Sequence, residues 1–433
     1  MKLSSSDLVE LVYGEVAILG GGVSGLAAQK LIIQKGGQAD IFDEKGKEFT
    51  LNHARKCSLV IRSPGFRPDH PWLRTAEMAN KVILTEIDLG AIFSEHQYLL
   101  AITGTNGKTS LTTILAHVCG KLGIDCEIAG NIGTPLCELI LQGKTRGKII
   151  FLEMSSFQAV SIQRLSPDAV IWTNFAEDHL DYHSDEKNYF NAKKNLLRAC
   201  NISQNTWIGK SVSEAAARLG IELGQSHKEV LPIDLDEIPE TIPPFLKTFP
   251  QRENLALAQS WFLSRGFSSE LFFRKLTGYK EQPYRLSKVE TVKGVHFWND
   301  SKSTNLASVI SACKSFKEKL LWIGGGRNKG QRLDEFAVAL KPFISKAFLF
   351  GECSKNLHRS FQSRGLSSII CQDLKHAVKL AFQWSKRSEN IVFSPGFASF
   401  DLYLNYEARG NSFNQLVFDL KSTEQMSTNL CLN

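Results

Sequence analysis

The chain has 433 residues, of which 43% are hydrophobic and 22% are charged, a composition typical of folded globular proteins rather than of disordered or fibrous ones. Its length exceeds what one hydrophobic core usually organises, so we expect two or three domains. The formal net charge is +7, with no run of Lys and Arg and no basic-aromatic interleaving, which argues against a nucleic-acid partner and suits pockets for anionic small molecules.

The amino-terminal stretch MKLSSSDLVELVYGEVAILG has no long apolar run before its first charges, so it does not resemble a signal peptide. The apolar stretches elsewhere are too short to span a membrane. The nine cysteines are odd in number and form no C-x-x-C pair, which argues against a disulfide framework or a zinc site. We expect a cytoplasmic protein with no membrane insertion, and we expect it to be a monomer.

The first block, EVAILGGGVSG followed by a helical pattern and QADIFDEK, predicts a strand, a glycine turn, a helix and a second strand. Gly20, Gly22 and Gly25 match G-x-G-x-x-G, and Asp43 lies near the position of the acidic residue that contacts a ribose. The pattern alone favours NAD or FAD, but any nucleotide diphosphate satisfies it. A tight turn that binds nothing remains the alternative.

The second block, YLLAITGTNGKTSLTT (98–113), predicts a strand, a glycine loop and a helix. A Walker loop, G-x-x-x-x-G-K-[ST], would need a glycine where Ile102 stands, and the nearest earlier glycine is Gly104. The loop is shortened but keeps the parts of a phosphate site. Lys108 would reach the phosphates, and Thr109 would bind Mg²⁺. The alternative is an ordinary turn with a solvated lysine.

Two further strand ends of this block carry polar side chains. Glu153 follows the strand GKIIFLE and could bind Mg²⁺ beside substrate phosphates or cap the next helix. His179 lies in TNFAEDHLDYH after the strand PDAVIW, and Lys193 lies 14 residues on, in a helical stretch. Taken alone, each of these residues could be structural.

The third block alternates apolar strands with amphipathic helices such as LKHAVKLAFQWSK. Such alternation predicts mostly parallel sheets covered by helices, so the fold class is α/β. We place domain boundaries near residues 97 and 282, giving domains 1–97, 98–282 and 283–433. The proline-rich acidic stretch 225–250 is predicted to be a loop or small excursion of the middle domain.

Polar groups recur after the strands of this third block. NDSKSTN offers Asp300, Ser301 and Lys302, and GGGRNKG holds Lys329 in a glycine loop. SPGFASFD places Ser399 before a helix, where it could line a pocket or simply cap the helix.

The order of these motifs is more specific than any one of them. GTNGKT, EMSSFQ, TNFAEDHLDYH, NAKK, NDSKSTN, GGGRNKG and SPGFASFD together resemble the Mur ligases, ATP-dependent amide-forming enzymes of peptidoglycan precursor synthesis. The resemblance covers nearly the whole chain. It implies a Rossmann-like N-terminal domain for a UDP substrate, a central P-loop-type mononucleotide-binding domain for ATP, and a C-terminal Rossmann-like domain for an amino acid.

Within that family the chain looks most similar to the D-glutamate-adding member, on its length, its N-terminal glycine turn and SPGFASFD. That likeness implies that ATP phosphorylates the carboxylate of UDP-N-acetylmuramoyl-L-alanine and that D-glutamate attacks the acyl phosphate. ATP, two Mg²⁺ ions and a carbamylated Lys193 are the cofactors implied. The glycine turn at Gly20 then binds UDP rather than NAD.

The resemblance also assigns roles to residues. Those assigned to catalysis are Lys108, Lys193, His179 and Lys302. Those assigned to ATP are Gly104, Thr105, Asn106, Gly107, Lys108, Thr109, Ser110, Asn254, Arg285 and Asp300. Those assigned to the metal ions are Thr109, Glu153, His179 and Lys193. Those assigned to the UDP substrate are Val23, Ser24, Asp43, Lys45, Gly65 and Asn131. Those assigned to D-glutamate are Lys302, Thr304, Lys329, Ser399, Phe400 and Tyr406. Glu253 stands where the family usually has histidine, although Asn254 is kept.

Four alternatives stay open on the sequence alone. The L-alanine-adding ligase carries GTHGKT, whereas Asn106 stands here. Folylpolyglutamate synthase lacks the N-terminal glycine turn. A regulatory protein that lost catalysis would not need to keep Lys108, Glu153, His179 and Lys193. A dehydrogenase would rest on G-x-G-x-x-G alone.

Overall fold

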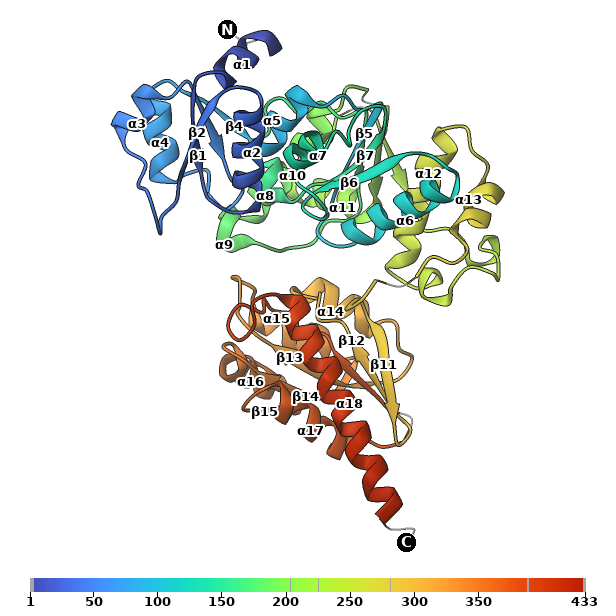
Figure 1. The fold of residues 1–433 in the computed structure, drawn as a ribbon. Helices are drawn as coiled ribbons and strands as arrows, with labels where there is room; N and C mark the ends of the chain where they lie inside the picture. The colour runs from blue at the N-terminus through green and yellow to red at the C-terminus, as the bar shows by residue number, and fades with distance from the viewer. Residues whose placement is uncertain (1–3, 203, 225, 281, 388, 431–433) are drawn as a thin grey trace. The chain divides into compact units, whose positions relative to one another are not determined.

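The computed structural model describes residues 4–202, 204–224, 226–280, 282–387 and 389–430, and the chain clusters into two compact units. Unit 1 consists of Met1–Ala176, Ser184–Lys247 and Gln251–Tyr279, and unit 2 consists of Glu177–His183, Thr248–Pro250 and Lys280–Asn433. The described residues form three β-sheets, of which two lie in unit 1 and one lies in unit 2 (Figure 1).

The first sheet of unit 1 has, in its described part, four parallel strands in the order β2-β1-β3-β4. Its strands are β1 (Glu15–Leu19), β2 (Gln38–Phe42), β3 (Leu59–Arg62) and β4 (Val82–Thr85). Its helices are α1 (Ser5–Val12), α2 (Val23–Gln34), α3 (Leu51–Lys56), α4 (Pro71–Met78) and α5 (Glu86–Phe93). Apolar side chains of α1, α2 and α5 fill one face and those of α3 and α4 fill the other, which is why β3 is buried along its whole length.

The second sheet of unit 1 has six parallel strands among the described residues, in the order β10-β9-β8-β5-β7-β6. The strands are β5 (Tyr98–Thr103), β6 (Cys126–Gly130), β7 (Ile149–Glu153), β8 (Ala169–Trp172), β9 (Thr206–Gly209) and β10 (His227–Val230). The helices of this region are α6 (Lys108–Lys121), α7 (Leu136–Leu141), α8 (Ser156–Ala159), α9 (Leu180–His183), α10 (Glu186–Ala199), α11 (Lys210–Leu219), α12 (Gln251–Ser264) and α13 (Ser269–Leu276), with 3₁₀ turns η1 (Leu235–Glu237) and η2 (Pro244–Lys247). Every residue of β5 is buried, and the glycine loop leaves its carboxyl end between β7 and β8.

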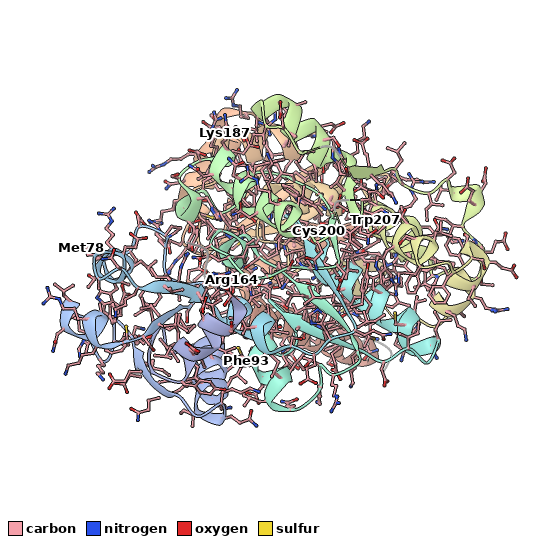
Figure 2. The ribbon with its side chains drawn as sticks, turned by 90° about the horizontal axis from the view of Figure 1, so that it is seen from above. Met78, Phe93, Arg164, Lys187, Cys200 and Trp207 are labelled. Carbon is pink, nitrogen blue, oxygen red and sulfur yellow. The ribbon has the colours of Figure 1, made fainter. Side chains whose placement is uncertain are left out.

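Two buried carboxylates on the first turn of α5 fasten the two sheets of unit 1 together. Asp88 Oδ1 accepts hydrogen bonds from the backbone N–H groups of 163, 164 and 165 at 2.7–3.1 Å, and Figure 2 labels Arg164 of this segment and Phe93 at the end of α5. Glu86 Oε1 accepts from the N–H of Cys137 at 2.7 Å, in the first turn of α7. Burial raises the pKa of Glu86 to about 7. The first turn of α5 therefore anchors two separate segments of the second sheet's layer.

The third sheet, in unit 2, has six strands in its described part, in the order β11-β12-β16-β13-β14-β15, and only β11 is antiparallel to its neighbour. The strands are β11 (Ser287–Val292), β12 (Val295–Asn299), β13 (Leu320–Gly325), β14 (Ile344–Phe350), β15 (Ser368–Ile370) and β16 (Asn390–Phe393). The helices are α14 (Leu306–Cys313), α15 (Leu333–Leu340), α16 (Ser354–Ser363), α17 (Leu374–Trp384) and α18 (Tyr406–Leu430). Helices α17 and α18 cover one face and α14, α15 and α16 cover the other.

These three sheets confirm the predicted α/β class and the predicted strands at the start of each block. The stretch 225–250 contains β10, which extends the second sheet, and two 3₁₀ turns. The division into three domains at residues 97 and 282 remains a prediction. Of the cysteines, the eight within the described residues are all free thiols, and Cys431 lies outside that range. A search of the described helices finds none with the length and apolar character needed to cross a membrane.

Candidate active site

The glycine loop 104–107 lies at the carboxyl edge of the second sheet, between β5 and α6. Gly104 (φ +151°) and Gly107 (φ +81°) adopt backbone conformations that other residues rarely reach, and a Cβ on Gly104 would lie 1.8 Å from Thr173 Oγ1. Gly107 is the N-cap of α6. The backbone N–H groups of the first helical turn therefore point out of the helix end, where an anion is stabilised.

Two lysines converge on this loop from different helices. Lys108 Nζ donates to the backbone oxygens of Gly104 (2.8 Å) and Thr105 (3.0 Å), and Lys193 Nζ donates to the same Gly104 oxygen (2.8 Å). Lys193 comes from α10, is buried, and lies 4.8 Å from the ring centroid of Tyr189. Two ammonium groups at one oxygen repel each other, and a bound polyanion would reduce that repulsion.

Glu153 ends β7 beside the glycine loop, in register with Ile102 of β5 on one side and Gly130 of β6 on the other. Its side chain is 1% exposed, and Oε1 accepts a hydrogen bond from Asn131 Nδ2 at 2.9 Å. Within the described part of the chain, Oε2 has no hydrogen-bond partner. A buried carboxylate oxygen without a donor is costly unless a cation neutralises it. The residues at this strand end therefore fit a divalent metal ion.

The other predicted ATP residues of unit 1 surround the start of α6. Thr109 and Ser110 lie in its first turn, and Ser110 Oγ accepts a hydrogen bond from Gln251 Nε2 at 3.4 Å. Asn254 on α12 is buried with its carboxamide against Gly107, where an added Cβ would lie 2.5 Å from Asn254 Oδ1. Asn254 therefore packs on the loop itself in this structure.

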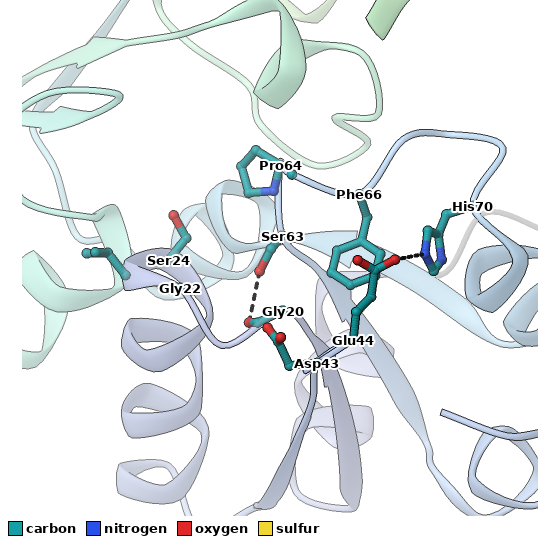
Figure 3. A pocket seen from close by; sticks show the side chains of 11 residues that line it. Gly20, Gly22, Ser24, Asp43, Glu44, Ser63, Pro64, Phe66 and His70 are labelled. Atoms are coloured by element: carbon teal, nitrogen blue, oxygen red, sulfur yellow. Dashed lines mark hydrogen bonds and ion pairs between the residues drawn. The ribbon is translucent and has the colours of Figure 1, made fainter. Parts of the chain in front are cut away.

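A pocket of about 410 Å³ lies at the carboxyl edge of the first sheet (Figure 3). Its lining residues are Gly20, Gly22, Val23, Ser24, Asp43, Glu44, Ser63, Pro64, Gly65, Phe66 and His70. Gly22 and Ser24 lie on one side, at the start of α2, and Phe66, Glu44 and His70 lie on the other (Figure 3). His70 Nε2 lies 3.0 Å from Glu44 Oε1, and its ring packs edge-on against Phe66. The pocket thus has a helix N-terminus at one end and an aromatic wall at the other.

Asp43 holds the glycine turn of this pocket in place. Its carboxylate accepts hydrogen bonds from the N–H of Gly21 (3.0 Å) and of Lys45 (3.2 Å), and these bonds lower the pKa of Asp43. Of the six residues predicted for the UDP substrate, four line the pocket: Val23, Ser24, Asp43 and Gly65. Lys45 and Asn131 are not among the lining residues of this pocket, and Asn131 bonds to Glu153.

In unit 2, three loops meet at the carboxyl edge of the third sheet: 300–305 after β12, 326–331 after β13 and 394–400 after β16. Gln331 Nε2 donates to a backbone oxygen in each of the other two loops, at 3.3 and 3.0 Å. Arg327 and Ala398 exchange backbone hydrogen bonds of 2.9 and 3.1 Å. The structure therefore brings together the three motifs predicted for the amino-acid end.

The predicted D-glutamate residues differ in how these loops present them. Lys302 Nζ lies 3.7 Å from the ring centroid of Tyr406, a cation–π contact at the start of α18. Thr304 is half-buried, and its backbone oxygen is one of those that Gln331 binds. Ser399 is buried, whereas the neighbouring Phe400 is 65% exposed. Lys302 and Tyr406 thus form a contact, and Phe400 faces solvent.

Asp178 organises the short segment that clusters with unit 2. It is 4% exposed and accepts hydrogen bonds from Lys329 Nζ (3.2 Å), Asn305 Nδ2 (2.8 Å) and the N–H of His179 (2.8 Å). Burial would raise the pKa of Asp178, but the Lys329 ammonium and His179 lower it to about 2. His179 itself has a left-handed backbone (φ +56°). Two predicted site residues, His179 and Lys329, are therefore joined through a carboxylate.

Asp300 is a buried residue of unit 2 whose carboxylate accepts several hydrogen bonds. Its carboxylate accepts hydrogen bonds from Ser303 Oγ (2.5 Å), Ser394 Oγ (2.7 Å) and the N–H of Leu286 (3.1 Å). Burial raises its pKa to about 6, although these bonds and the Arg285 charge act the other way. In this structure Asp300 ties loops together, and Arg285 is its electrostatic neighbour.

Comparisons with known proteins bear directly on this geometry. The family model described as the Mur ligase middle domain matches residues 102–230. The chain is 31% identical to the UDP-N-acetylmuramoylalanine--D-glutamate ligase of Desulfovibrio desulfuricans, covering 96% of this chain and 99% of that protein. It is 30% identical to the protein of the same name from Chlamydia felis, covering 95% and 99%. The chain belongs to the Mur ligase family.

The fold agrees with that of another Mur ligase. The MurF ligase of Thermotoga maritima, solved in complex with ADP, aligns with a TM-score of 0.57 at 15% identity, covering 96% of each chain. The matched middle domain of this Mur ligase is the layer that contains the glycine loop, Glu153 and Lys193.

Some residues of this Mur ligase site escaped the sequence-based prediction. Thr173 and Asn174 contact the glycine loop, Asp178 binds Lys329, and Phe66 and His70 wall the first pocket. Thr173 and Asn174 directly follow β8, the neighbour of the predicted site strand β5, and that position is the signal that could have found them.

Proposed function

We infer that this Mur ligase joins D-glutamate to UDP-N-acetylmuramoyl-L-alanine with conversion of ATP to ADP and phosphate, a step of peptidoglycan precursor synthesis. The observation that carries the inference is the phosphate end of unit 1. There a shortened glycine loop, two lysines and a buried carboxylate converge, and one oxygen of that carboxylate has no hydrogen-bond partner in the part of the chain that the structure describes. The names of relatives that match over nearly the whole chain support D-glutamate as the acceptor.

The chemistry has two steps. An oxygen of the substrate carboxylate attacks the γ-phosphorus of ATP, the bond from that phosphorus to the bridging oxygen breaks, and ADP leaves. The amino nitrogen of D-glutamate, once deprotonated, then attacks the carbonyl carbon of the acyl phosphate. The carbon–oxygen bond to phosphate breaks, which leaves an amide and inorganic phosphate. Both steps bring anions together, so they depend on alignment and charge neutralisation.

Unit 1 supplies that neutralisation. The N-terminus of α6 offers backbone N–H groups to the phosphates, and Lys108 lies one residue inside it. In this structure the Lys108 ammonium donates to the loop's own carbonyl oxygens at 2.8 and 3.0 Å, so it is already held beside the helix end. From this position the Lys108 ammonium is proposed to pair with the β/γ-phosphates of ATP.

Thr109, Glu153 and Lys193 are the residues of unit 1 that would hold the metal ions, with His179 as the predicted fourth. A bound Mg²⁺ screens the phosphate charges and fixes their geometry. Glu153 Oε1 already accepts a hydrogen bond from Asn131, so Oε2 is the oxygen through which Glu153 would hold the metal. Among the solved structures with this fold is the folylpolyglutamate synthase/dihydrofolate synthase of Yersinia pestis complexed with AMPPNP and a Mn ion.

Lys193 is proposed to act as a carbamate. Its neutral amine would add CO₂ to give a carbamate anion and a proton, which replaces one of two repelling cations by a metal-binding carboxylate. The support is its position, buried and at the same oxygen as Lys108. Incubation with ¹³C-bicarbonate should give one carbamate carbon resonance that is lost in Lys193→Arg, and a spectrum without it would contradict this role.

The UDP part of the substrate is assigned to the pocket of the first sheet. Its pyrophosphate would lie at the N-terminus of α2, near Ser24, and its base end near Phe66 and His70.

The D-glutamate carboxylates are assigned to Lys302 and Lys329 of unit 2, as charge partners. The proposed phosphate site belongs to unit 1, and the proposed amino-acid site belongs to unit 2. The enzyme is proposed to work as a monomer in the cytoplasm.

The test is phosphate release from ATP with UDP-N-acetylmuramoyl-L-alanine and Mg²⁺, adding amino acids singly. Release that requires D-glutamate and disappears in Lys108→Ala supports the proposal. Release with L-alanine on UDP-N-acetylmuramate would instead assign the L-alanine-adding activity. If folded protein binds ATP but releases no phosphate with any of the amino acids tested, that result would contradict an enzymatic role.

A further inference from the structure

The shortened glycine loop is braced by the end of a neighbouring strand. Strand β8 lies beside β5, and the two residues that follow it, Thr173 and Asn174, face the loop. The backbone ladder continues past both strands, because Thr173 N–H donates to Thr103 O (2.9 Å) and Thr105 N–H donates to Asn174 O (3.0 Å). The loop is thus paired with a second chain segment along its first half.

Side chains then fix a single loop residue, Asn106. Its backbone N–H donates to Asn174 Oδ1 (2.9 Å), while its backbone oxygen accepts from Asn174 Nδ2 (3.1 Å) and from Thr173 Oγ1 (2.6 Å). One carboxamide therefore binds both backbone polar groups of Asn106, and a hydroxyl adds a third bond. Thr173 is 1% exposed, so water competes little for these bonds.

The consequence lies in the peptide bond that joins Asn106 to Gly107. In a trans peptide the carbonyl oxygen and the following N–H point in opposite directions. Because Thr173 and Asn174 hold the Asn106 oxygen on the β8 side, the Gly107 N–H is directed away from β8. Gly107 is also the N-cap of α6, where backbone N–H groups serve as anion donors.

We propose that Thr173 and Asn174 are positioning residues of the phosphate site, which orient the Asn106–Gly107 peptide so that its N–H, and not its carbonyl oxygen, meets the nucleotide phosphates. A flipped peptide would place a carbonyl oxygen against the phosphate anion. A full-length Walker loop has four residues between its two glycines, whereas this loop has two. Here the side chains of Thr173 and Asn174, which lie outside the loop, fix the conformation of its backbone. The proposal rests on the proposed function for the identity of the ligand as ATP.

The first test is Asn174→Ala, with Asn205→Ala as its matched control. Asn205 Nδ2 also donates to a backbone oxygen, that of Asp168 (3.2 Å), but at the opposite, amino end of β8. We expect Asn174→Ala to raise the Kd of a non-hydrolysable ATP analogue with Mg²⁺ about tenfold, which corresponds to about 1.4 kcal/mol. We expect Asn205→Ala to leave that Kd unchanged, and both variants to bind UDP-N-acetylmuramoyl-L-alanine as the parent does.

A second pair keeps the test decisive if Asn174→Ala does not fold. Thr173→Val keeps the shape and removes the hydroxyl, whereas Thr173→Ser keeps the hydroxyl. We expect a weaker nucleotide affinity only in Thr173→Val. Equal nucleotide affinity in Asn174→Ala and the parent, or equal losses in Thr173→Val and Thr173→Ser, would overturn the proposal. Absence of D-glutamate-dependent turnover in the parent would refute the proposed function instead, because nucleotide affinity is measured without an acceptor.

Discussion

The proposed phosphate site of unit 1 and the proposed amino-acid site of unit 2 are stabilised by different kinds of contact. Around the glycine loop, the polar groups of neighbouring strand ends bind one another, and one buried oxygen, on Glu153, is left without a partner among the described residues. In unit 2, Lys329 is already paired with a buried carboxylate, and Phe400 faces solvent. Lys108 and Lys329 both begin in internal contacts, but Lys108 donates to neutral carbonyl oxygens whereas Lys329 is paired with a carboxylate, so the amino-acid end has the stronger internal contact to exchange for a ligand.

Lys108→Ala should have the largest effect, because it removes the cation at the N-terminus of α6. We expect the rate of phosphate release to fall by about 100-fold or more, in line with the loss of a charge partner of the transferred phosphoryl group. Lys121→Ala, at the other end of the same helix, is the control and should keep its activity. A Lys108→Ala enzyme within about fivefold of the parent would mean that this site is not where ATP reacts.

Glu153→Gln should come next, because it removes the negative charge and keeps the shape. We expect activity to fall by on the order of 100-fold at fixed Mg²⁺ and the Mg²⁺ concentration for half-maximal rate to rise, since a neutral amide is a weaker ligand for this ion. Glu127→Gln, on the neighbouring β6, is the control, since Glu127 pairs with Lys148 instead. An unchanged Mg²⁺ requirement would remove Glu153 from the metal site.

Glu86→Gln tests how the buried carboxylate of Glu86 affects the stability of unit 1 as a function of pH. Burial raises the folded-state pKa of Glu86 from 4.5 to about 7, so folding takes up a proton between these values, and stability is lost as the pH rises over that window. Glutamine keeps an acceptor for Cys137 N–H and has no charge. We expect the variant to be more stable at about pH 8 by on the order of 2 kcal/mol and equal at about pH 4, measured by denaturant unfolding. A difference that does not change with pH would contradict this account of Glu86.

Lys302→Ala probes the amino-acid end, where a smaller and more selective effect is expected. The KM for D-glutamate should rise about tenfold while the KM for ATP stays constant, because the lysine would meet a carboxylate in a partly exposed setting. Lys421→Ala, which removes a unit 2 lysine paired with Glu290, is the control. Parallel rises in both KM values would indicate general damage to unit 2.

Much of this arrangement follows from the sequence, and the reason is geometric. In a parallel sheet the carboxyl ends of all strands share one edge, so polar residues directly after apolar runs gather there. That rule alone predicts that Gly104, Lys108 and Glu153 lie together, and the same rule brings the three loops of unit 2 together.

Other features depend on strand order and side-chain direction, which the sequence does not reveal. The stretch TNFAEDH pointed to His179, whereas the contacts with the glycine loop come from Thr173 and Asn174, because β8 is the neighbour of β5. Asn131, which is predicted for the UDP substrate, also bonds to Glu153, because β6 and β7 are adjacent. To predict these contacts, one must know the strand order and register of the sheet, which the pattern of apolar and polar residues in the sequence does not give.

The central claim is that the substrate carboxylate becomes an acyl phosphate at the glycine loop. Substrate labelled with ¹⁸O in the L-alanyl carboxylate tests it most directly, by mass spectrometry of the phosphate released with ATP and D-glutamate. The account predicts one ¹⁸O atom in each phosphate, because the attacking carboxylate oxygen stays on phosphorus when the amide forms. Phosphate without the label, released together with the amide product, would contradict it.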